Sequence, residues 1–135
     1  MNTVDPLLTM AEQVMAIERE GAALTRPWYT FEPPKSGDPE RLHALLQQSK
    51  ETLDRMAPLL DERVRGAGDR DRPALQHAYN LVAELRQSRE ATEALLQADR
   101  EGTRGYQEDF RALAIKEQAA EQQARQLFDV LRRIQ

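Results

Sequence analysis

The sequence contains no cysteine, and this absence removes several kinds of chemistry at once. Disulfide bonds, thiolate nucleophiles and cysteine-based zinc sites are all excluded. Aromatic residues make up only 5% of the chain, and only two histidines are present. No apolar run approaches about 18 residues, the length that a membrane-spanning helix needs. Few of the residue types on which catalytic and metal sites are usually built therefore remain.

The two histidines, His43 and His77, do not form a metal-binding pattern. Neither has a histidine or a paired carboxylate four residues away on its expected helix. Glu40 and His43 match half of a carboxylate–iron motif, but a diiron bundle needs a second pair. The motifs of nucleotide-binding loops, serine hydrolases and zinc metalloproteases are also missing. We therefore expect no catalytic residue, no metal, no cofactor and no small-molecule substrate, and we expect that the protein is not an enzyme.

Charge and the N-terminal residues restrict the partners and the compartment. The net charge is −4, and acidic and basic residues are interspersed along the chain. Nucleic-acid binding would require a basic patch, so we expect no nucleic-acid partner. The first residues lack the basic and apolar regions of a secretory signal peptide. We expect a cytoplasmic protein that does not associate with membranes.

The second half of the chain shows a regular apolar spacing. Steps of three and four residues from Leu75 reach mostly apolar positions as far as Ile134. A stripe with this heptad period predicts a helix that packs along other helices. Arg89, Thr92, Asp99 and Thr103 interrupt the stripe, so we expect its middle part to be partly solvated. These positions are Leu75, Ala78, Val82, Leu85, Arg89, Thr92, Leu96, Asp99, Thr103, Tyr106, Phe110, Leu113, Glu117, Ala120, Ala124, Leu127, Leu131 and Ile134.

The predicted fold is one all-α domain over residues 1–135, an antiparallel helical bundle resembling a coiled coil. The first helix covers about 5–25, with Asp5 as N-cap and Pro6 at its first position. Its apolar face consists of Leu7, Met10, Val14, Ile17, Gly21 and Leu24. We expect this helix to end near residue 25, because Pro27 disfavours helical geometry in the residue before it.

The second helix is expected over about 38–64 and starts with the same device, Asp38 followed by Pro39. Its apolar positions keep their phase across Pro58, which favours one helix with a kink over two helices. Residues 65–72 contain two glycines and alternating charges, which predicts a solvated turn. The C-terminal helical segment then covers about 72–134.

Gly102 and Gly105 leave two interpretations of the C-terminal segment open. Two glycines in four residues cost a helix roughly 2 kcal/mol relative to alanine, and a turn here would produce two helices of similar length. The heptad phase nevertheless continues unbroken from Leu96 to Tyr106. We favour one long C-terminal helix that bends at Gly102–Gly105.

An aromatic and proline-rich segment over 26–37 contains Trp28, Tyr29 and Phe31. These rings can anchor a crossover loop over the end of the bundle, or they can form a docking strip for a partner. We favour the anchoring role and keep the three residues as candidate partner-binding residues.

The last turns of the chain carry a dense apolar face that reaches the final residues, where chain ends are usually polar. Such a face either packs against the first helix or binds a partner or a second copy of the chain. The candidate partner-binding residues here are Ala124, Leu127, Phe128, Leu131 and Ile134.

The stretch 38–66 runs from Pro39-Glu40-Arg41-Leu42-His43-Ala44-Leu45-Leu46 to Lys50, Leu53, Leu59, Leu60, Glu62 and Arg63. It resembles the helical pattern of the filament-junction chaperones among flagellar and type III secretion export chaperones. The run from Leu81 through Leu95 and Leu96 to Phe110 is similar to the same pattern. Residues 28–34 depart from it. The resemblance implies a small helical export chaperone and assigns no functional residue.

Two functions follow as hypotheses. The first is a non-enzymatic binding protein, an export chaperone or adaptor that holds a partner's amphipathic helix. The alternative is a structural, self-assembling subunit of a phage particle or secretion apparatus that oligomerises through its C-terminal helix.

Overall fold

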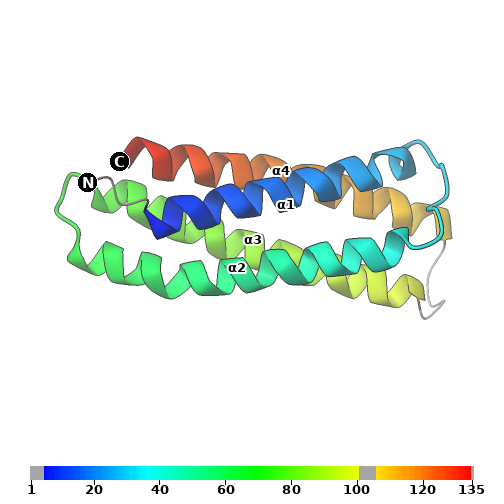
Figure 1. Ribbon diagram of the computed structural model, residues 1–135, viewed down its shortest axis with the longest axis horizontal. Helices are drawn as coiled ribbons and strands as arrows, with labels where there is room; N and C mark the ends of the chain where they lie inside the picture. Colours follow the sequence, from blue (N-terminus) through cyan, green and yellow to red (C-terminus); the bar gives the residue numbers. More distant parts are fainter. Residues whose placement is uncertain (1–4, 101–105, 135) are drawn as a thin grey trace.

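A computed structural model gives the structure of the protein and describes residues 5–100 and 106–134, with side chains for 5–98 and 109–134. The described residues form four helices, α1 (Pro6–Tyr29), α2 (Asp38–Gly66), α3 (Arg72–Arg100) and α4 (Tyr106–Ile134). They lie side by side in an elongated antiparallel bundle (Figure 1). The predicted all-α bundle is confirmed.

Each helix packs against two neighbours and lies diagonally opposite the fourth helix. The packed pairs are α1 with α2, α2 with α3, α3 with α4, and α4 with α1. Short connections place consecutive helices next to each other, and the α1–α4 contact closes the bundle. The first residues of α1 and the last residues of α4 therefore lie at the same end (Figure 1).

The two Asp-Pro helix starts behave differently. The Asp5 carboxylate accepts a hydrogen bond from the backbone N–H of Leu7 at 2.9 Å, as expected of an N-cap. Asp38, by contrast, is the first residue of α2, and Gly37 precedes it with a φ of 90°. The Asp38 carboxylate accepts from the N–H of Lys35 at 3.1 Å, so its prediction as N-cap is wrong.

The first helix does not end near residue 25. It continues through Pro27 to Tyr29, which leaves only residues 30–37 outside a helix in this connection. A proline inside a helix costs about 3 kcal/mol. The continuation buries the ring of Trp28, and burial of such a ring contributes ~3–5 kcal/mol. Trp28 also meets Phe110 edge to face, with ring centroids 5.2 Å apart, so packing outweighs the proline.

The preference for one long C-terminal helix is also wrong. Two helices, α3 and α4, pack antiparallel against each other, so the chain reverses direction between residues 100 and 106 (Figure 1). Gly102 and Gly105 themselves lie outside the described residues. The second helix does continue through Pro58 as one helix, and α3 begins at Arg72 after a short turn.

The apolar core forms two clusters. The larger one lies towards the end of the bundle where α1 begins and α4 ends, and the smaller one lies around Trp28. The larger cluster contains Leu7, Ala11, Val14, Leu53, Met56, Leu60, Leu75, Ala78, Leu81, Val82, Leu85, Ala120, Ala124, Leu127 and Leu131. The smaller cluster contains Trp28, Leu42, Leu46, Leu96, Phe110, Leu113 and Ala114. Among the described helices, none is long and apolar enough to cross a membrane.

Candidate protein-binding surface and buried polar layer

The C-terminal apolar face packs inside the bundle. Ala124, Leu127 and Leu131 are at most 1% exposed and belong to the larger core cluster. Phe128 and Ile134 are partly buried and pack against the same cluster. The interpretation of the fully buried residues as a partner surface must therefore be corrected: they are core, and a partner could reach them only if the bundle opened.

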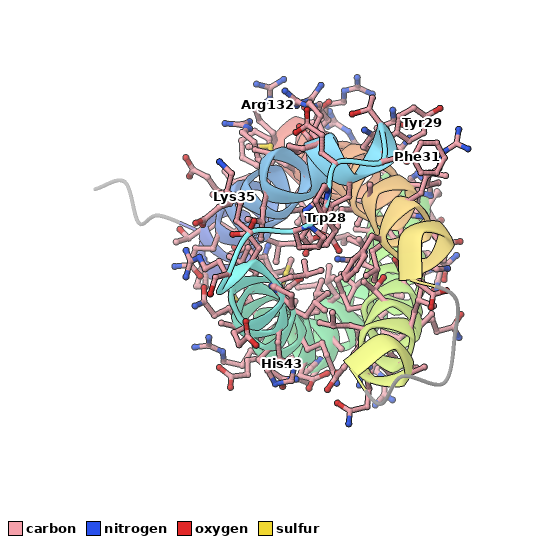
Figure 2. All side chains as sticks on the ribbon, turned by 90° about the vertical axis from the view of Figure 1, so that its right-hand side faces the viewer. Trp28, Tyr29, Phe31, Lys35, His43 and Arg132 are labelled. Carbon is pink, nitrogen blue, oxygen red and sulfur yellow. The ribbon has the colours of Figure 1, made fainter. Side chains whose placement is uncertain are left out.

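The three aromatic residues of the 26–37 segment separate into one core residue and two surface residues. Trp28 points into the bundle, whereas Tyr29 and Phe31 point outwards and are 41% and 50% exposed (Figure 2). The guanidinium of Arg111 on α4 lies 4.7 Å from the Tyr29 ring centroid and 5.3 Å from that of Phe31. Phe31 has a φ of 66°, a left-handed conformation that is costly for a residue with a side chain. Tyr29, Phe31 and Arg111 form what we call the aromatic corner.

A groove with a volume of about 460 Å³ runs between α3 and α4 on the outside of the bundle. Ile115, at 49% exposure, lies on α4 one helical turn from Arg111. The α3–α4 groove is lined by small or apolar side chains and one lysine: Ala91, Ala94, Leu95, Ala98, Ala112 and Lys116. Arg111 of the aromatic corner, Ile115 and the groove residues Ala112 and Lys116 thus all lie within residues 111–116 of α4.

Surface ion pairs join other helix pairs of the bundle. Arg41 pairs with Glu20 between α2 and α1. Between α2 and α3, Lys50 Nζ lies 2.7 Å from Glu93 Oε2, and this hydrogen bond lowers the pKa of Glu93 and raises that of Lys50. Arg86 likewise pairs with Asp54 at 2.8 Å.

The α3–α4 groove differs from these helix pairs in its charges. Among the described side chains, no surface ion pair joins α3 to α4. Within the part of the chain whose side chains are described, Arg111 and Lys116 also have no carboxylate partner. The groove therefore combines an apolar floor with the charge of Lys116, and the charge of Arg111 lies at the aromatic corner.

Between the two core clusters lies a layer of buried polar side chains. Arg89 of α3 is fully buried and stands between two carboxylates, Glu18 of α1 and Glu117 of α4, each 1% exposed. Its Nη1 atom lies 3.0 Å from Glu18 Oε2 and 2.5 Å from Glu117 Oε1. Ser49 of α2 and Thr92 of α3 are buried beside them. We call these five residues the polar layer.

Burial dominates the electrostatics of the polar layer. Loss of solvation raises the pKa of Glu117 to about 7; the Arg89 charge opposes this rise, and the Glu18 charge adds to it. Burial also raises the pKa of Glu18, against the opposing effect of Arg89. Ser49 Oγ lies near Glu18 and favours its ionised form, but neither Ser49 Oγ nor Glu18 Oε2 completes a hydrogen bond of normal geometry.

Gly21 on α1 leaves room for one of these carboxylates. A Cβ atom built on Gly21 would overlap Glu117 Oε2 and lie 3.4 Å from Glu117 Cδ. The expectation that the middle of the stripe is solvated is wrong for Arg89 and Thr92, because buried partners satisfy most of their polar atoms. Asp99 and Thr103 lie outside the residues whose side chains are described.

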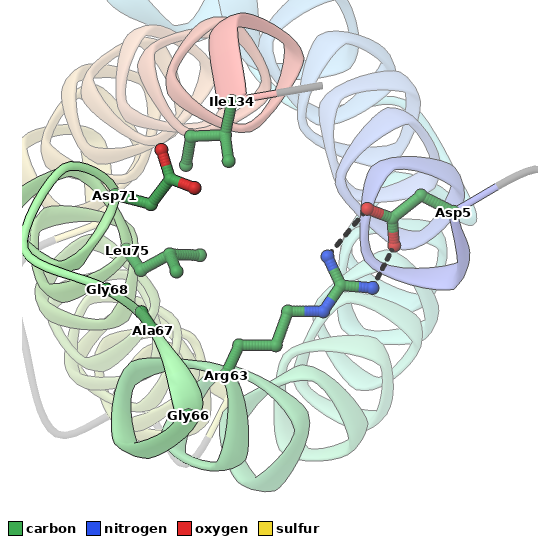
Figure 3. A pocket seen from close by; sticks show the side chains of 8 residues that line it. All are labelled: Asp5, Arg63, Gly66, Ala67, Gly68, Asp71, Leu75 and Ile134. Atoms are coloured by element: carbon green, nitrogen blue, oxygen red, sulfur yellow. Dashed lines mark hydrogen bonds and ion pairs between the residues drawn. The ribbon is translucent and has the colours of Figure 1, made fainter.

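The end of the bundle where α1 begins is open and polar. Both guanidinium nitrogens Nη1 and Nη2 of Arg63 bond the Asp5 carboxylate at 2.6 Å, and the hydrogen bonds raise the pKa of Arg63 (Figure 3). A pocket with a volume of about 520 Å³ lies at this end of the bundle, and Leu75 and Ile134 line its apolar side. Among the described residues, no group of three or more His, Cys, Asp or Glu side chains could hold a metal ion. The Asp5–Arg63 pair ties the N-terminus of α1 to α2.

Comparison of the chain with protein-family models, with curated proteins and with solved structures finds no match. Tyr29 and Phe31 were predicted from the sequence as candidate contact residues, whereas Arg111, Ile115 and the α3–α4 groove were not. Alanines at 91, 94, 98 and 112 carry no distinctive signal, because alanine is common on both faces of helices. Only the packing of α3 on α4 brings them together.

Proposed function

We propose that this protein is a cytoplasmic, non-enzymatic binding protein, an adaptor or export chaperone that holds an amphipathic helix of a partner along the α3–α4 groove. The observation that carries the proposal is the location of the exposed large hydrophobic side chains. Within the described residues these are Tyr29, Phe31 and Ile115. Tyr29 and Phe31 belong to the aromatic corner, and Ile115 lies on α4 between the groove residues Ala112 and Lys116 in sequence.

The lining of the groove supports a helix as the bound element. Small side chains such as Ala91, Ala94 and Ala112 let a helix approach closely, and helices pack with axes about 8–10 Å apart. Amphipathic helices commonly bind in grooves of this kind through apolar residues on one face. The partner's helix would then form a fifth helix on the outside of α3 and α4, with its end against Tyr29 and Phe31.

The charges beside the groove favour an acidic partner. Arg111 and Lys116 lie on either side of Ala112, and neither is paired with a carboxylate among the described residues. Glutamate or aspartate residues flanking the apolar face of the partner's helix would supply the missing charges. Complementary charges of this kind determine specificity more than affinity.

Labelled helical peptides with one common apolar face test the proposal directly. One peptide carries glutamates beside this face and the other carries lysines, and fluorescence anisotropy measures their binding to the full chain. We expect the acidic peptide to bind about tenfold more tightly, which corresponds to ~1.4 kcal/mol from two partly exposed charge pairs. Reversing both charges, Arg111→Glu with Lys116→Glu, should exchange the preference.

Arg55→Glu serves as the matched control, because Arg55 lines the separate groove between α1 and α2. This variant should bind the acidic peptide like the unaltered protein. Equal binding of both peptides, or equal loss in the control, would contradict the proposal. Concentration-dependent sedimentation that Ile115→Glu abolishes would show instead that the surface joins copies of the chain.

A further inference from the structure

We propose that the polar layer is a proton-binding site, in which Glu18 and Glu117 share one proton across Arg89 in the folded bundle. Folding would then take up a proton at neutral pH. The bundle would become more stable in mild acid and less stable in mild alkali.

The polar layer contains more acidic than basic groups. Two carboxylates meet one guanidinium, and all three side chains are at most 1% exposed. With both carboxylates ionised, the layer would carry an uncompensated negative charge between two apolar clusters. An unpaired charge in such surroundings costs several kcal/mol, whereas one protonated carboxyl leaves the layer neutral.

Among the described side chains, none other than Arg89 brings a positive charge to the second carboxylate. On α1 the facing group is Glu18 itself, and on α2 it is the uncharged Ser49. On α3, Arg89 is the one described charged side chain that acts on the layer, and the hydroxyls of Ser88 and Thr92 lie beside it. These groups and Glu117 are the described charged or hydroxyl side chains that act on the layer.

On α4, besides Glu117, the Lys116 backbone oxygen accepts from Arg89 Nη2 at 3.3 Å and adds no full charge. The N–H groups of the guanidinium therefore already donate to groups on α3 and α4, so fewer donors remain for a second carboxylate. The direction of both pKa shifts agrees with this geometry, because burial raises the pKa of Glu18 and of Glu117.

The contacts of Glu18 point the same way. Glu18 Oε2 shares Arg89 Nη1 with Glu117 Oε1, and among the described residues neither Glu18 Oε2 nor the buried Ser49 Oγ completes a hydrogen bond of normal geometry. A proton on Glu18 would create a hydrogen-bond donor beside the Ser49 hydroxyl. A proton on Glu117 would make Glu117 neutral, and Arg89 would then form its ion pair with Glu18 alone. Either position of the proton keeps a single ion pair in the layer.

The sign of the pH dependence follows from the raised pKa. The folded protein holds a proton that the unfolded chain releases at a lower pH, so stability rises as the pH falls. For Glu117 the contribution is fully present below the ordinary value of 4.5 and is lost as the pH rises through about 7. The unfolding equilibrium constant should increase by about tenfold or more between mildly acid and mildly alkaline pH.

Urea denaturation across this pH range measures the effect, and carboxyl-carbon NMR of the folded protein locates the proton. We expect one glutamate carboxyl to titrate near neutrality and to be assigned to Glu18 or Glu117. Glu117→Gln removes one titratable group at the same size, so its unfolding constant should change far less with pH. Replacing both histidines, His43→Gln with His77→Gln, should leave the pH dependence in place, although histidines in general titrate in this range.

The NMR titration also decides the question if Glu117→Gln does not fold, because it uses the unaltered chain. Ordinary carboxyl titration of both glutamates would overturn the proposal. So would equal pH profiles of the unaltered protein and a folded Glu117→Gln variant.

Discussion

Gly21 offers the most direct test of how α1 and α4 fit together. A glycine inside a helix normally costs up to about 1 kcal/mol relative to alanine, so Gly→Ala usually stabilises. Here the added Cβ would overlap Glu117 Oε2, and the carboxylate would have to leave its position beside Arg89. We therefore expect Gly21→Ala to destabilise the bundle.

The magnitude follows from two opposing terms. Alanine contributes about 1 kcal/mol through its higher helix propensity. Displacing one partner of a buried charge pair, so that the other loses its compensating charge, costs about 3–5 kcal/mol. The net loss is about 2–4 kcal/mol. For a chain of this size, such a loss lowers the melting temperature by roughly 6–15 °C.

Urea denaturation followed by circular dichroism gives the change in unfolding free energy, with Gly66→Ala as the control. Gly66 is the last residue of α2, and a Cβ there meets no atom within 4 Å. This control should be neutral or slightly stabilising. The second control places Gly21→Ala in a Glu117→Ala background, where the overlap is gone and the helix propensity of alanine should reappear as a gain.

A higher stability of Gly21→Ala in the otherwise unaltered protein would contradict this expectation. That result would mean that Glu117 can leave the space beside Gly21 at little cost. The ion pair with Arg89 would then contribute little to the bundle.

Two further predictions concern residues that flank α1, Phe31 after it and Asp5 before it. Phe31→Gly should be more stable than Phe31→Ala by about 1 kcal/mol in thermal melts. Both changes remove the ring, but only glycine accepts the left-handed backbone without strain. An alanine variant of equal or greater stability would contradict this prediction. Asp5→Ala should cost about 1–2 kcal/mol in urea denaturation, since the carboxylate caps α1 and bonds Arg63. Arg63→Met removes only the partly exposed pair and should cost less than about 1 kcal/mol, and a larger loss than for Asp5→Ala would refute the capping argument.

Heptad counting placed the core correctly even where it misplaced the helices. Described stripe positions such as Leu75, Leu96, Phe110 and Leu131 are buried, although the chain reverses between α3 and α4. Each of the two helices has its own apolar stripe facing the core. The number of residues between the end of one stripe and the start of the next happens to fit the heptad period, so the period continues unbroken through Gly102 and Gly105. Periodicity alone therefore cannot distinguish a long helix from a hairpin of two helices.

On α1 the apolar pattern predicted a buried face that is slightly rotated from the face that is buried in the bundle. Met10, Ile17 and Leu24 are only partly buried, while Glu18 and Thr25 are fully buried. Only Glu18 has a partner that cannot be read from α1 itself, whereas Thr25 is satisfied within the helix. Glu18 faces Arg89 of another helix, and the Thr25 hydroxyl donates to the Gly21 carbonyl oxygen at 2.9 Å.

The candidate surface was partly predictable. Tyr29 and Phe31 stand out in a chain with few aromatic residues, and both are exposed. Their neighbour Trp28 has the same composition signal but lies in the core, because only one side of the last turn of α1 faces the bundle. Arg111 became recognisable only once α4 was placed beside that turn.

The position of Trp28 also gives the protein a built-in optical probe. Trp28 is the only tryptophan of the chain, and it belongs to the smaller core cluster, beyond the polar layer from the larger one. Its fluorescence therefore reports the packing around Phe110, whereas the helical signal in circular dichroism reports all four helices. Coincident transitions by the two methods are a test of all-or-none unfolding. In this bundle their separation would reveal one half of the core opening while the other half remains packed.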